Sequence, residues 1–473
     1  MKNRLTISTA LLLAPLAALH AAEQTKSSSR PNIILILADD VSARDLSCYG
    51  GPVQMPVLDR LAKQGVQFNN AWAAPLCGPT RAILHTGKYP HHQGYYENTV
   101  TPRVAFYDDS RHLPLLRMAK AAGYATGMFG KMHFGNDPGK YGADVHCVAR
   151  YWKGYDGPSH SPDGSREGMY GVSWYWHPGE ILNGVGIPTT ADDFGPDVEL
   201  KQLLGFIDAN KDRPFFVYWP TNLPHMERSP KTGYRTFSYT SVPELDAKGA
   251  RTGNKVGGSL QSTMGYLDFL IGRIQNRLQQ LGLAENTVLF FAADNGTANG
   301  DKGSYERDYA IRVPFVVAGG PVKSRGLSAT LVDFTDIWPT VADLAGYNGN
   351  RNTDGHSFAT YLLDQPFTSR QTIQMAMNNA RWIRDQDWLL DGRGRFFDLR
   401  RATKQTDYKD VSESSDPETM AARKRFERLL MDIPLPDEDD PLTRNAWKKF
   451  RNSSSNGKPV KVFRPSYLKQ AKE

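Results

Sequence analysis

Residues 76–87 combine a cysteine with residue types that favour chemistry on an anion. Pro79 and Arg81 follow Cys77 at the second and fourth positions. Proline suits the first turn of a helix, and the apolar residues that follow continue it, so a helix is predicted to begin beside Cys77. Free N–H groups and the dipole at a helix N-terminus attract an anion, and Arg81, one turn later, adds a fixed positive charge. The pattern predicts that Cys77 faces a bound anion, the alternative being a buried structural cysteine.

Polar side chains also follow four short apolar runs that we expect to be strands. Ligands of open α/β sheets bind at the carboxyl ends of the strands, so these side chains should converge. Three carboxylates and one amide make an all-oxygen set, which favours Ca²⁺ over Zn²⁺ and also suits Mg²⁺. One pair of acidic or amide residues after a strand is usually a helix cap or a turn. Two such pairs, with histidine and lysine after other strands, indicate a metal-binding or catalytic site. The residues are Asp39 and Asp40, Asp294 and Asn295, Lys131 and His133, and His225.

The elements that must position these residues alternate between strand and helix. Buried parallel strands are predicted at 32–38, 124–129, 214–219, 287–293 and 313–317, because these runs do not alternate polar with apolar residues. Helical patterns lie between them, at 55–64, 113–122, 197–210 and 259–281. The alternation predicts an α/β fold with a large, mostly parallel sheet sandwiched by helices.

The rest of the chain divides into segments that differ in composition and in periodicity. Residues 136–196 are Gly-rich and aromatic, and are predicted to form an irregular insertion. Short antiparallel strands are predicted at 372–377, 380–383, 388–390 and 395–399, with turns at 378–379 and Gly392, then a helix over 417–431 and a basic tail. The predicted organisation is a signal peptide over 1–22, a catalytic domain over 23–356 and a C-terminal α+β subdomain over 357–473.

Composition sets limits on the class of protein. The 473 residues are 40% hydrophobic and 23% charged, enough for a full core. A charged start, an apolar run over 10–19 and small residues near Ala22 are typical of an export signal, which predicts a periplasmic or secreted protein. No other run is long enough to span a membrane, and no nucleic-acid-binding pattern accompanies the formal charge of +7. Cys48 and Cys147 form either a disulfide or two free thiols.

The segment from Cys77 to Gly87, with Thr86-Gly87 at its end, resembles the signature of type I sulfatases of the alkaline phosphatase superfamily. In that family the cysteine is oxidised to formylglycine by a formylglycine-generating or anaerobic sulfatase-maturing enzyme. The resemblance extends to Pro31–Asp40, Gly130–His133, Pro224-His225, Asp294–Gly296 and Lys302, and it runs to about Gly346. It implies a sulfuric ester hydrolase acting on a sulfated carbohydrate.

The resemblance also implies a role for each matched residue. A divalent metal would be bound by Asp39, Asp40, Asp294 and Asn295, and by the formylglycine made from Cys77.

Five further residues would act on the substrate. Arg81 and Lys131 would offset charge around the nucleophile, and Lys302 would face the sulfate. His225 would protonate the leaving alcohol, and His133 would take a proton from the second hydroxyl as the aldehyde is restored.

Some positions depart from the family pattern. Thr80 stands for the commoner serine and Met132 for tryptophan. Before Arg-Val-Pro at 312–314, residues 306–311 read Glu-Arg-Asp-Tyr-Ala-Ile where the family usually has Glu-Gly-Gly. The proline usually found two residues after the second histidine is missing after His225. These departures indicate a divergent subfamily with its own substrate.

Aromatic and basic residues elsewhere suit a sulfated sugar, or pack on their own domain. The candidate substrate contacts are His91, His92, Arg103, Trp174, Trp176 and His177.

Two other functions fit the same residues. One is a phosphonate or phosphodiester hydrolase of the same superfamily, and the other is a sulfated-glycan binding protein without turnover.

Overall fold

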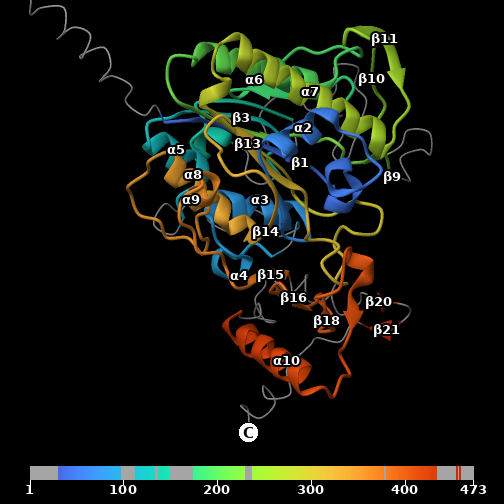
Figure 1. Cartoon of the computed structure of the whole chain (residues 1–473). Helices are drawn as coiled ribbons and strands as arrows, with labels where there is room; N and C mark the ends of the chain where they lie inside the picture. Colours follow the sequence, from blue (N-terminus) through green and yellow to red (C-terminus); the bar gives the residue numbers. More distant parts are fainter. Residues whose placement is uncertain are drawn as a thin grey trace, which may run out of the picture.

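The computed structural model describes residues 30–96, 98, 112–133, 137–149, 174–228, 237–377 and 380–433, with two short strands at 454–455 and 458–459. Its centre is a ten-stranded sheet in the order β14-β2-β13-β12-β1-β7-β3-β4-β5-β6 (Figure 1). In that order the strands are Gly326–Asp333, Val66–Trp72, Phe315–Gly319, Thr287–Ala293, Asn32–Ala38, Phe215–Pro220, Ala125–Gly130, Val145–Ala149, Glu180–Leu182 and Val185–Gly186.

The sheet is mixed and mostly parallel, as predicted. The five strands β12, β1, β7, β3 and β4 pair in parallel, and so do β14 and β2. The predicted bounds of β1 and β12 match the structure, and those of β3 and β7 differ by one residue. The alternating strand and helix pattern therefore predicted the α/β class correctly.

The prediction of a parallel strand over 313–317 was wrong in direction. The strand there, β13, runs antiparallel to both of its neighbours, β12 and β2. Its residues are buried on both faces, so its apolar run looks the same in either direction. The chain reverses between β12 and β13 through a loop without an α-helix, which allows the antiparallel pairing.

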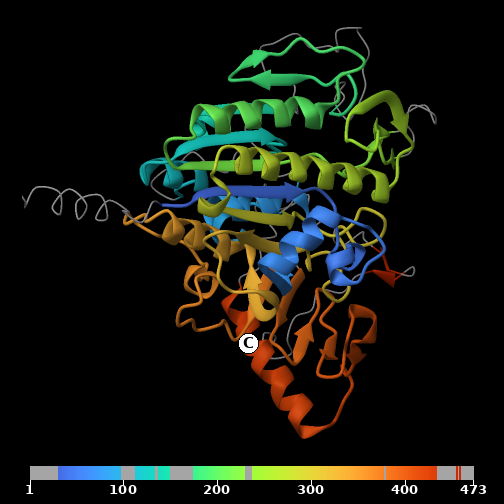
Figure 2. The ribbon, with the colours of Figure 1, turned by 45° about the horizontal axis from the view of Figure 1, so that its top comes forward.

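Helices cover both faces of the sheet (Figures 1 and 2). On one face lie α2 (Pro56–Gln64), α6 (Gly195–Ala209) and α7 (Leu260–Gln280). On the other lie α3 (Cys77–Thr86), α5 (Leu115–Ala121) and α8 (Ile337–Leu344), with the short helices α4 (Pro90–Gln93) and α9 (Ala359–Leu362). Several of the predicted helices show clear start signals, such as Pro56 at the first position of α2, Pro196 in the first turn of α6 and the Ser259 cap of α7.

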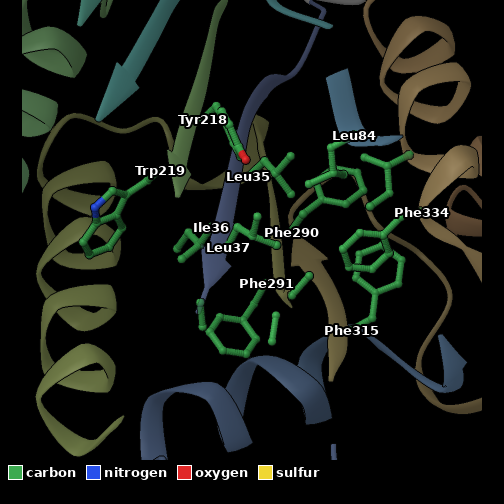
Figure 3. Packing of buried hydrophobic residues seen from close by; sticks show 14 of the residues in the cluster. Leu35, Ile36, Leu37, Leu84, Tyr218, Trp219, Phe290, Phe291, Phe315 and Phe334 are labelled. Atoms are coloured by element: carbon green, nitrogen blue, oxygen red, sulfur yellow. The ribbon is translucent and has the colours of Figure 1, made fainter. Parts of the chain in front are cut away.

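The core lies between the sheet and these helices. Adjacent residues of a strand point to opposite faces, so Tyr218 and Trp219 of β7 contribute to different layers (Figure 3). Phe315 and Phe334 pack with ring centroids 6.1 Å apart on the face that carries Leu84 of α3. Each fully buried side chain of this size stabilises the fold by about 1.5–3 kcal/mol, and this packing fixes the strand ends that bear the polar residues.

Part of the predicted irregular insertion is ordered sheet. Strands β4, β5 and β6 extend the sheet beyond β3, and β5 pairs antiparallel with both β4 and β6. These strands are short and carry polar residues, so their stability comes from pairing with the existing sheet edge rather than from an apolar run of their own. Two separate two-stranded antiparallel sheets follow later in the chain, β8–β9 (Glu227–Arg228, Phe237–Ser238) and β10–β11 (Val242–Leu245, Arg251–Val256).

A second sheet follows α9, as predicted. It has five antiparallel strands in the order β15-β16-β17-β18-β19 and is packed against α10 (Pro417–Leu429). The strands are Ile373–Met377, Ala380–Arg384, Trp388–Leu390, Phe396–Asp398 and Lys409–Asp410. The predicted turn at 378–379 and most of the tail lie outside the described residues, apart from the β20–β21 pair (Ser454–Ser455, Lys458–Pro459).

Two further observations concern the whole chain. Cys48, Cys77 and Cys147 are all free thiols, so Cys48 and Cys147 do not pair. Among the described residues, no helix combines the length and the apolar character needed to cross a membrane.

Candidate active site

The register of the central strands brings the predicted polar residues to one edge of the sheet. Ala38 is paired with Ala293, so Asp39 and Asp294 leave the sheet side by side. The backbone N–H of Asp294 donates to the carbonyl of Ala38 at 3.0 Å. Lys131 leaves β3 at the same level, and its N–H donates to the carbonyl of Pro220 at the end of β7.

Helix α3 places Cys77 at this edge. Cys77 is the first residue of the helix, whereas the prediction placed it just before the helix, and its side chain is buried. Thr80 anchors the helix because its hydroxyl donates to the backbone carbonyl of Asp294 at 2.6 Å and accepts from the N–H of Ala74 at 2.9 Å. Threonine therefore supplies the hydroxyl that serine supplies in the commoner pattern.

The first turn of α3 has a side-chain acceptor that sequence reasoning missed. The Oδ1 atom of Asn98 accepts from the N–H of Gly78 at 2.9 Å. A Cβ atom at position 78 would lie 2.7 Å from the ring of Tyr95, so this close approach requires glycine. No signal in the sequence points to Asn98, because its partner is twenty residues away.

A buried ion-pair network surrounds Cys77. Its sulfur lies 3.4 Å from Asp39 Oδ1. Arg81 Nη2 is 2.7 Å from Asp294 Oδ2 and 3.4 Å from Asp39 Oδ2, and Lys131 Nζ also pairs with Asp39. All four charged side chains are fully buried, so the low dielectric strengthens each pair. The network gathers cations where an anion would sit.

Lys302 reaches the same site despite the altered segment that follows it. Its Nζ is 2.7 Å from Asp40 Oδ1. The preceding residue, Asp301, accepts from Ser42 Oγ at 2.6 Å and pairs with Arg44, which ties this loop to the loop after β1.

The two predicted histidines lie at the same edge. His225 Nε2 is 3.7 Å from Asp40 Oδ2, and its Nδ1 lies 2.8 Å from the carbonyl of Met226. A carbonyl only accepts hydrogen bonds, so Nδ1 carries the proton of the neutral ring. His133 and Asp40 both have positive φ angles, 64° and 72°. Such non-glycine strain of about 1–3 kcal/mol clusters at functional sites.

Burial and charge shift the pKa values in the network in both directions. Burial alone raises the pKa of Asp39, but Lys131, His225 and Arg81 outweigh it and hold that pKa well below its usual range. Burial and the Asp39 charge raise the pKa of Asp294 to about 7.

The thiol and the imidazoles are held neutral. Burial and the carboxylates of Asp294 and Asp39 raise the pKa of the Cys77 thiol well above its usual value. Burial and Lys131 lower the pKa of His225 to about 4 and move that of His133 well below its usual value.

The donor set fits a hard divalent cation. Asn295 Nδ2 donates to Asp40 Oδ1 at 2.7 Å, while the buried Asn295 Oδ1 atom has no hydrogen-bond partner among the residues that the structure describes. An unsatisfied buried oxygen costs about 1–3 kcal/mol unless a ligand binds it. One donor atom from each of four side chains lies within 4.8 Å of the others, and these are Asp39, Asp40, Cys77 and His225. Three of these belong to the predicted metal set, and the fourth, His225, is the predicted proton donor, which lies beside that set.

The candidate substrate contacts are engaged with their own domain. His91 and His92 follow the C-terminus of α3, about 15 Å of helix from Cys77. His92 pairs with Asp354 at 2.8 Å. The indole N–H of Trp176 donates to the carbonyl of Ser241 at 2.8 Å.

The other candidates follow the same pattern. His177 Nε2 is 3.1 Å from the carbonyl of Thr189, and Trp174 is only 3% exposed. Arg103 lies outside the described residues. A role of any of them in substrate binding stays a prediction.

Similarity to known proteins agrees with this geometry. The sulfatase family model matches residues 31–347. An N-acetylgalactosamine-6-O-sulfatase of Bacteroides thetaiotaomicron is 29% identical, over 77% of this chain and 82% of its own length. The N-acetylgalactosamine-6-sulfatase of Canis lupus familiaris is 30% identical, over 72% of this chain and 67% of its own. Human arylsulfatase A is 29% identical, over 77% of this chain and 72% of its own length.

Solved structures share the fold at lower identity. A protein solved in complex with its substrate D-glucosamine-2-N,6-O-disulfate has a TM-score of 0.65 at 20% identity, covering 88% of this chain and 99% of that one. A phosphonate monoester hydrolase from Silicibacter pomeroyi has a TM-score of 0.59 at 18% identity, and the match covers 85% of this chain and 94% of that one. The family match over two thirds of the sequence identifies the chain as a member of the sulfatase family, and hence as a sulfuric ester hydrolase.

Proposed function

We propose that this sulfatase removes sulfate from a sulfated carbohydrate, using a formylglycine made from Cys77 and a bound divalent metal. The observation that carries the proposal is the position of Cys77 at the first turn of α3, its sulfur 3.4 Å from Asp39 within a buried network of cations. A helix N-terminus surrounded by positive charge suits a sulfate group better than a neutral ester.

Each modified or bound group would supply one piece of chemistry. Formylglycine at position 77 would supply, through its hydrated aldehyde, a hydroxyl that attacks sulfur. A cation held by Asp39, Asp40, Asp294 and Asn295 would polarise a sulfate oxygen, with Ca²⁺ preferred and Mg²⁺ the alternative.

The chain's own residues would handle charge and protons. Arg81 and Lys131 are fixed by their carboxylate partners, so their positive charge needs no reorganisation when negative charge develops on the sulfate. Lys302, in the loop between β12 and β13, adds a third positive charge beside Asp40. His225 would donate a proton to the leaving alcohol, because a bound anion raises the pKa of a neighbouring imidazole. His133 would accept a proton from the second hydroxyl.

The carbohydrate substrate is supported by the relatives. Two of them are named for removing sulfate from N-acetylhexosamines, the N-acetylgalactosamine-6-O-sulfatase and an N-acetylglucosamine-6-O-sulfatase that is 24% identical. The formal net charge of +7, which becomes +5 when Lys2 and Arg4 leave with the export signal, also suits an anionic substrate.

The first experiment is mass spectrometry of the proteolytic peptide that contains Cys77, from protein made in its native source. We expect an aldehyde in place of the thiol, and sulfate release from N-acetylgalactosamine 6-sulfate that is lost in Cys77→Ala. An unmodified thiol in active protein would contradict the formylglycine. Phosphate release from an aryl phosphonate that exceeds sulfate release from the matched aryl sulfate would favour the phosphonate hydrolase instead.

We also propose export to the periplasm or the medium. The charged start and apolar run of residues 1–22 support it. N-terminal sequencing of the protein from its source tests it, with cleavage near Ala22 as the expected result and an intact Met1 as the opposing one.

A further inference from the structure

The loop that carries His225 crosses the carboxyl edge of the sheet and is held by backbone hydrogen bonds. The N–H of His225 donates to the carbonyl of Asn222 at 2.7 Å, which closes the turn. The N–H of Asp39 donates to the carbonyl of Leu223 at 2.9 Å. These bonds fix the middle of the turn, but the direction of the imidazole also depends on what the backbone carbonyl of His225 and the ring itself contact.

Tyr175 binds this turn from outside the sheet. Its hydroxyl lies 2.7 Å from the carbonyl of Asn222 and 2.7 Å from the carbonyl of His225. The phenol carries a single proton, so it bridges the two ends of the turn and donates to one carbonyl at a time. Tyr175 is fully buried, and its hydroxyl is committed to the turn rather than to solvent.

Trp174 contacts the imidazole itself. The two rings meet edge to face, with centroids 5.2 Å apart and planes at 74°. Such aromatic pairs add about 0.5–1.5 kcal/mol beyond the burial of area. Trp174 is only 3% exposed, so this edge-to-face contact is made by a buried side chain.

The Trp174-Tyr175 pair is itself anchored. The N–H of Gly195, at the start of α6, donates to the carbonyl of Tyr175 at 2.6 Å. The Tyr175 ring stacks on Phe194, with centroids 5.8 Å apart and planes at 17°. Tyr175 therefore connects the start of α6 to the turn that carries His225, through its backbone carbonyl at one end and its hydroxyl at the other.

We propose that Tyr175 and Trp174 are positioning residues for His225, holding its imidazole where it protonates the leaving alcohol. This inference rests on the proposed function. Tyr175 fixes the backbone on both sides of the turn, Trp174 fixes the plane of the ring, and the Nδ1–H bond to Met226 leaves Nε2 as the atom that faces the site.

Tyr175→Phe removes only the hydroxyl and is the central test. Displacing a catalytic group by about 1 Å can cost 10²-fold in rate, and proton donation matters most for poor leaving groups. We expect kcat/KM for N-acetylgalactosamine 6-sulfate to fall roughly 10-fold or more, and that for 4-nitrophenyl sulfate to change less than about 3-fold. A structural role alone would lower both rates by the same factor, and that result would overturn the proposal.

Tyr124→Phe is the matched control. The hydroxyl of Tyr124 also donates to a backbone carbonyl, that of Pro31 at 2.8 Å, but at the amino end of the sheet. Its removal should change neither rate. For Trp174, phenylalanine should restore most of the sugar-sulfate activity that alanine loses, because it keeps an aromatic edge against His225.

A second measurement does not depend on turnover. With ¹⁵N-labelled histidine, and His225→Gln to assign the signal, Tyr175→Phe should shift the imidazole nitrogen resonances of His225, and Tyr124→Phe should not. Unshifted resonances in Tyr175→Phe would overturn the positioning role. Wild-type protein that hydrolyses neither ester would instead overturn the proposed function, so the two failures are distinguishable.

Discussion

At the scale of single residues, the site is a set of buried charges that neutralise one another. Asp39 is shared by Arg81 and Lys131, and Asp40 is shared by Lys302 and His225. The effect of each buried group on catalysis and on stability depends on whether it is protonated. Substitutions of single residues should therefore change the rate of hydrolysis or the pH dependence of stability.

His225→Ala should act mainly on esters with poor leaving groups. A general acid contributes about 10²–10⁴-fold, so we expect at least roughly 100-fold loss on a sugar sulfate and a much smaller loss on 4-nitrophenyl sulfate. Steady-state kinetics on both esters checks this. His356→Ala, at an exposed position, is the control. Equal losses on the two esters would count against the acid role.

Glu199 predicts a pH dependence of stability. It is fully buried in α6, where its Oε2 accepts from the indole N–H of Trp219 at 3.0 Å, and burial raises the pKa of Glu199 to about 8. Between about pH 4.5 and pH 8 the unfolded chain releases this proton and the folded chain keeps it, so native stability falls as pH rises through that window.

Glu199→Gln keeps the side chain neutral. Its melting temperature relative to wild type should therefore rise from pH 5 to pH 8 in thermal denaturation, with exposed Glu413→Gln as a flat control. A constant difference across that range would refute the prediction.

At the scale of elements, the segment that departs from the family pattern joins the main sheet to the C-terminal sheet. Asp308 is fully buried and accepts from Arg384 at 3.1 Å, from Gln405 at 2.8 Å and from Tyr408 at 3.3 Å. Nearby, Tyr305 stacks on Trp382 of β16, with centroids 6.0 Å apart. The altered segment thus contacts the C-terminal sheet through Tyr305 and Asp308.

Asp308→Asn should destabilise the protein by about 3 kcal/mol, because it leaves Arg384 buried without its countercharge. Asp208→Asn removes a half-exposed pair with Arg277 and should cost less than about 1 kcal/mol. Urea denaturation of both variants makes the comparison. Similar costs for the two would mean that Asp308 does not hold the C-terminal sheet in place.

At the scale of the whole molecule, the proposed metal would join segments far apart in the sequence. Its ligands come from the loops after β1 and β12, some 255 residues apart, so its removal should affect the entire fold. A ligand at about 100 times its Kd stabilises the native state by about 2.7 kcal/mol.

Chelation should accordingly lower both the melting temperature and the sulfatase activity, and added Ca²⁺ should restore them better than Mg²⁺. Asn295→Ala, which removes the unpartnered oxygen, should abolish the effect of chelation on the melting temperature. Wild-type protein that melts at the same temperature with and without chelator would remove the metal from the proposal.

Much of this fold was predictable because its signals are local. The runs that form β1 and β12 are continuous and apolar, since both faces of those strands are buried, and their bounds follow directly. The start signals of α2 and α7 lie within one turn of each helix. The acidic residues after β1 and β12 indicated a site for the same reason, as they stand directly at the ends of recognisable strands.

The sequence by itself thus determined the α/β class, the edge of the sheet that carries the site and the residues gathered there. Only the tertiary structure decided the direction of β13, the addition of β4 to β6, and the contacts of Asn98 and Tyr175 with the site. The physical reason is the distance along the chain over which each kind of interaction acts. Periodicity and capping act over a few residues, whereas strand direction, edge pairing and the hydrogen bonds that orient Cys77 and His225 are made between segments that meet only after the chain has folded.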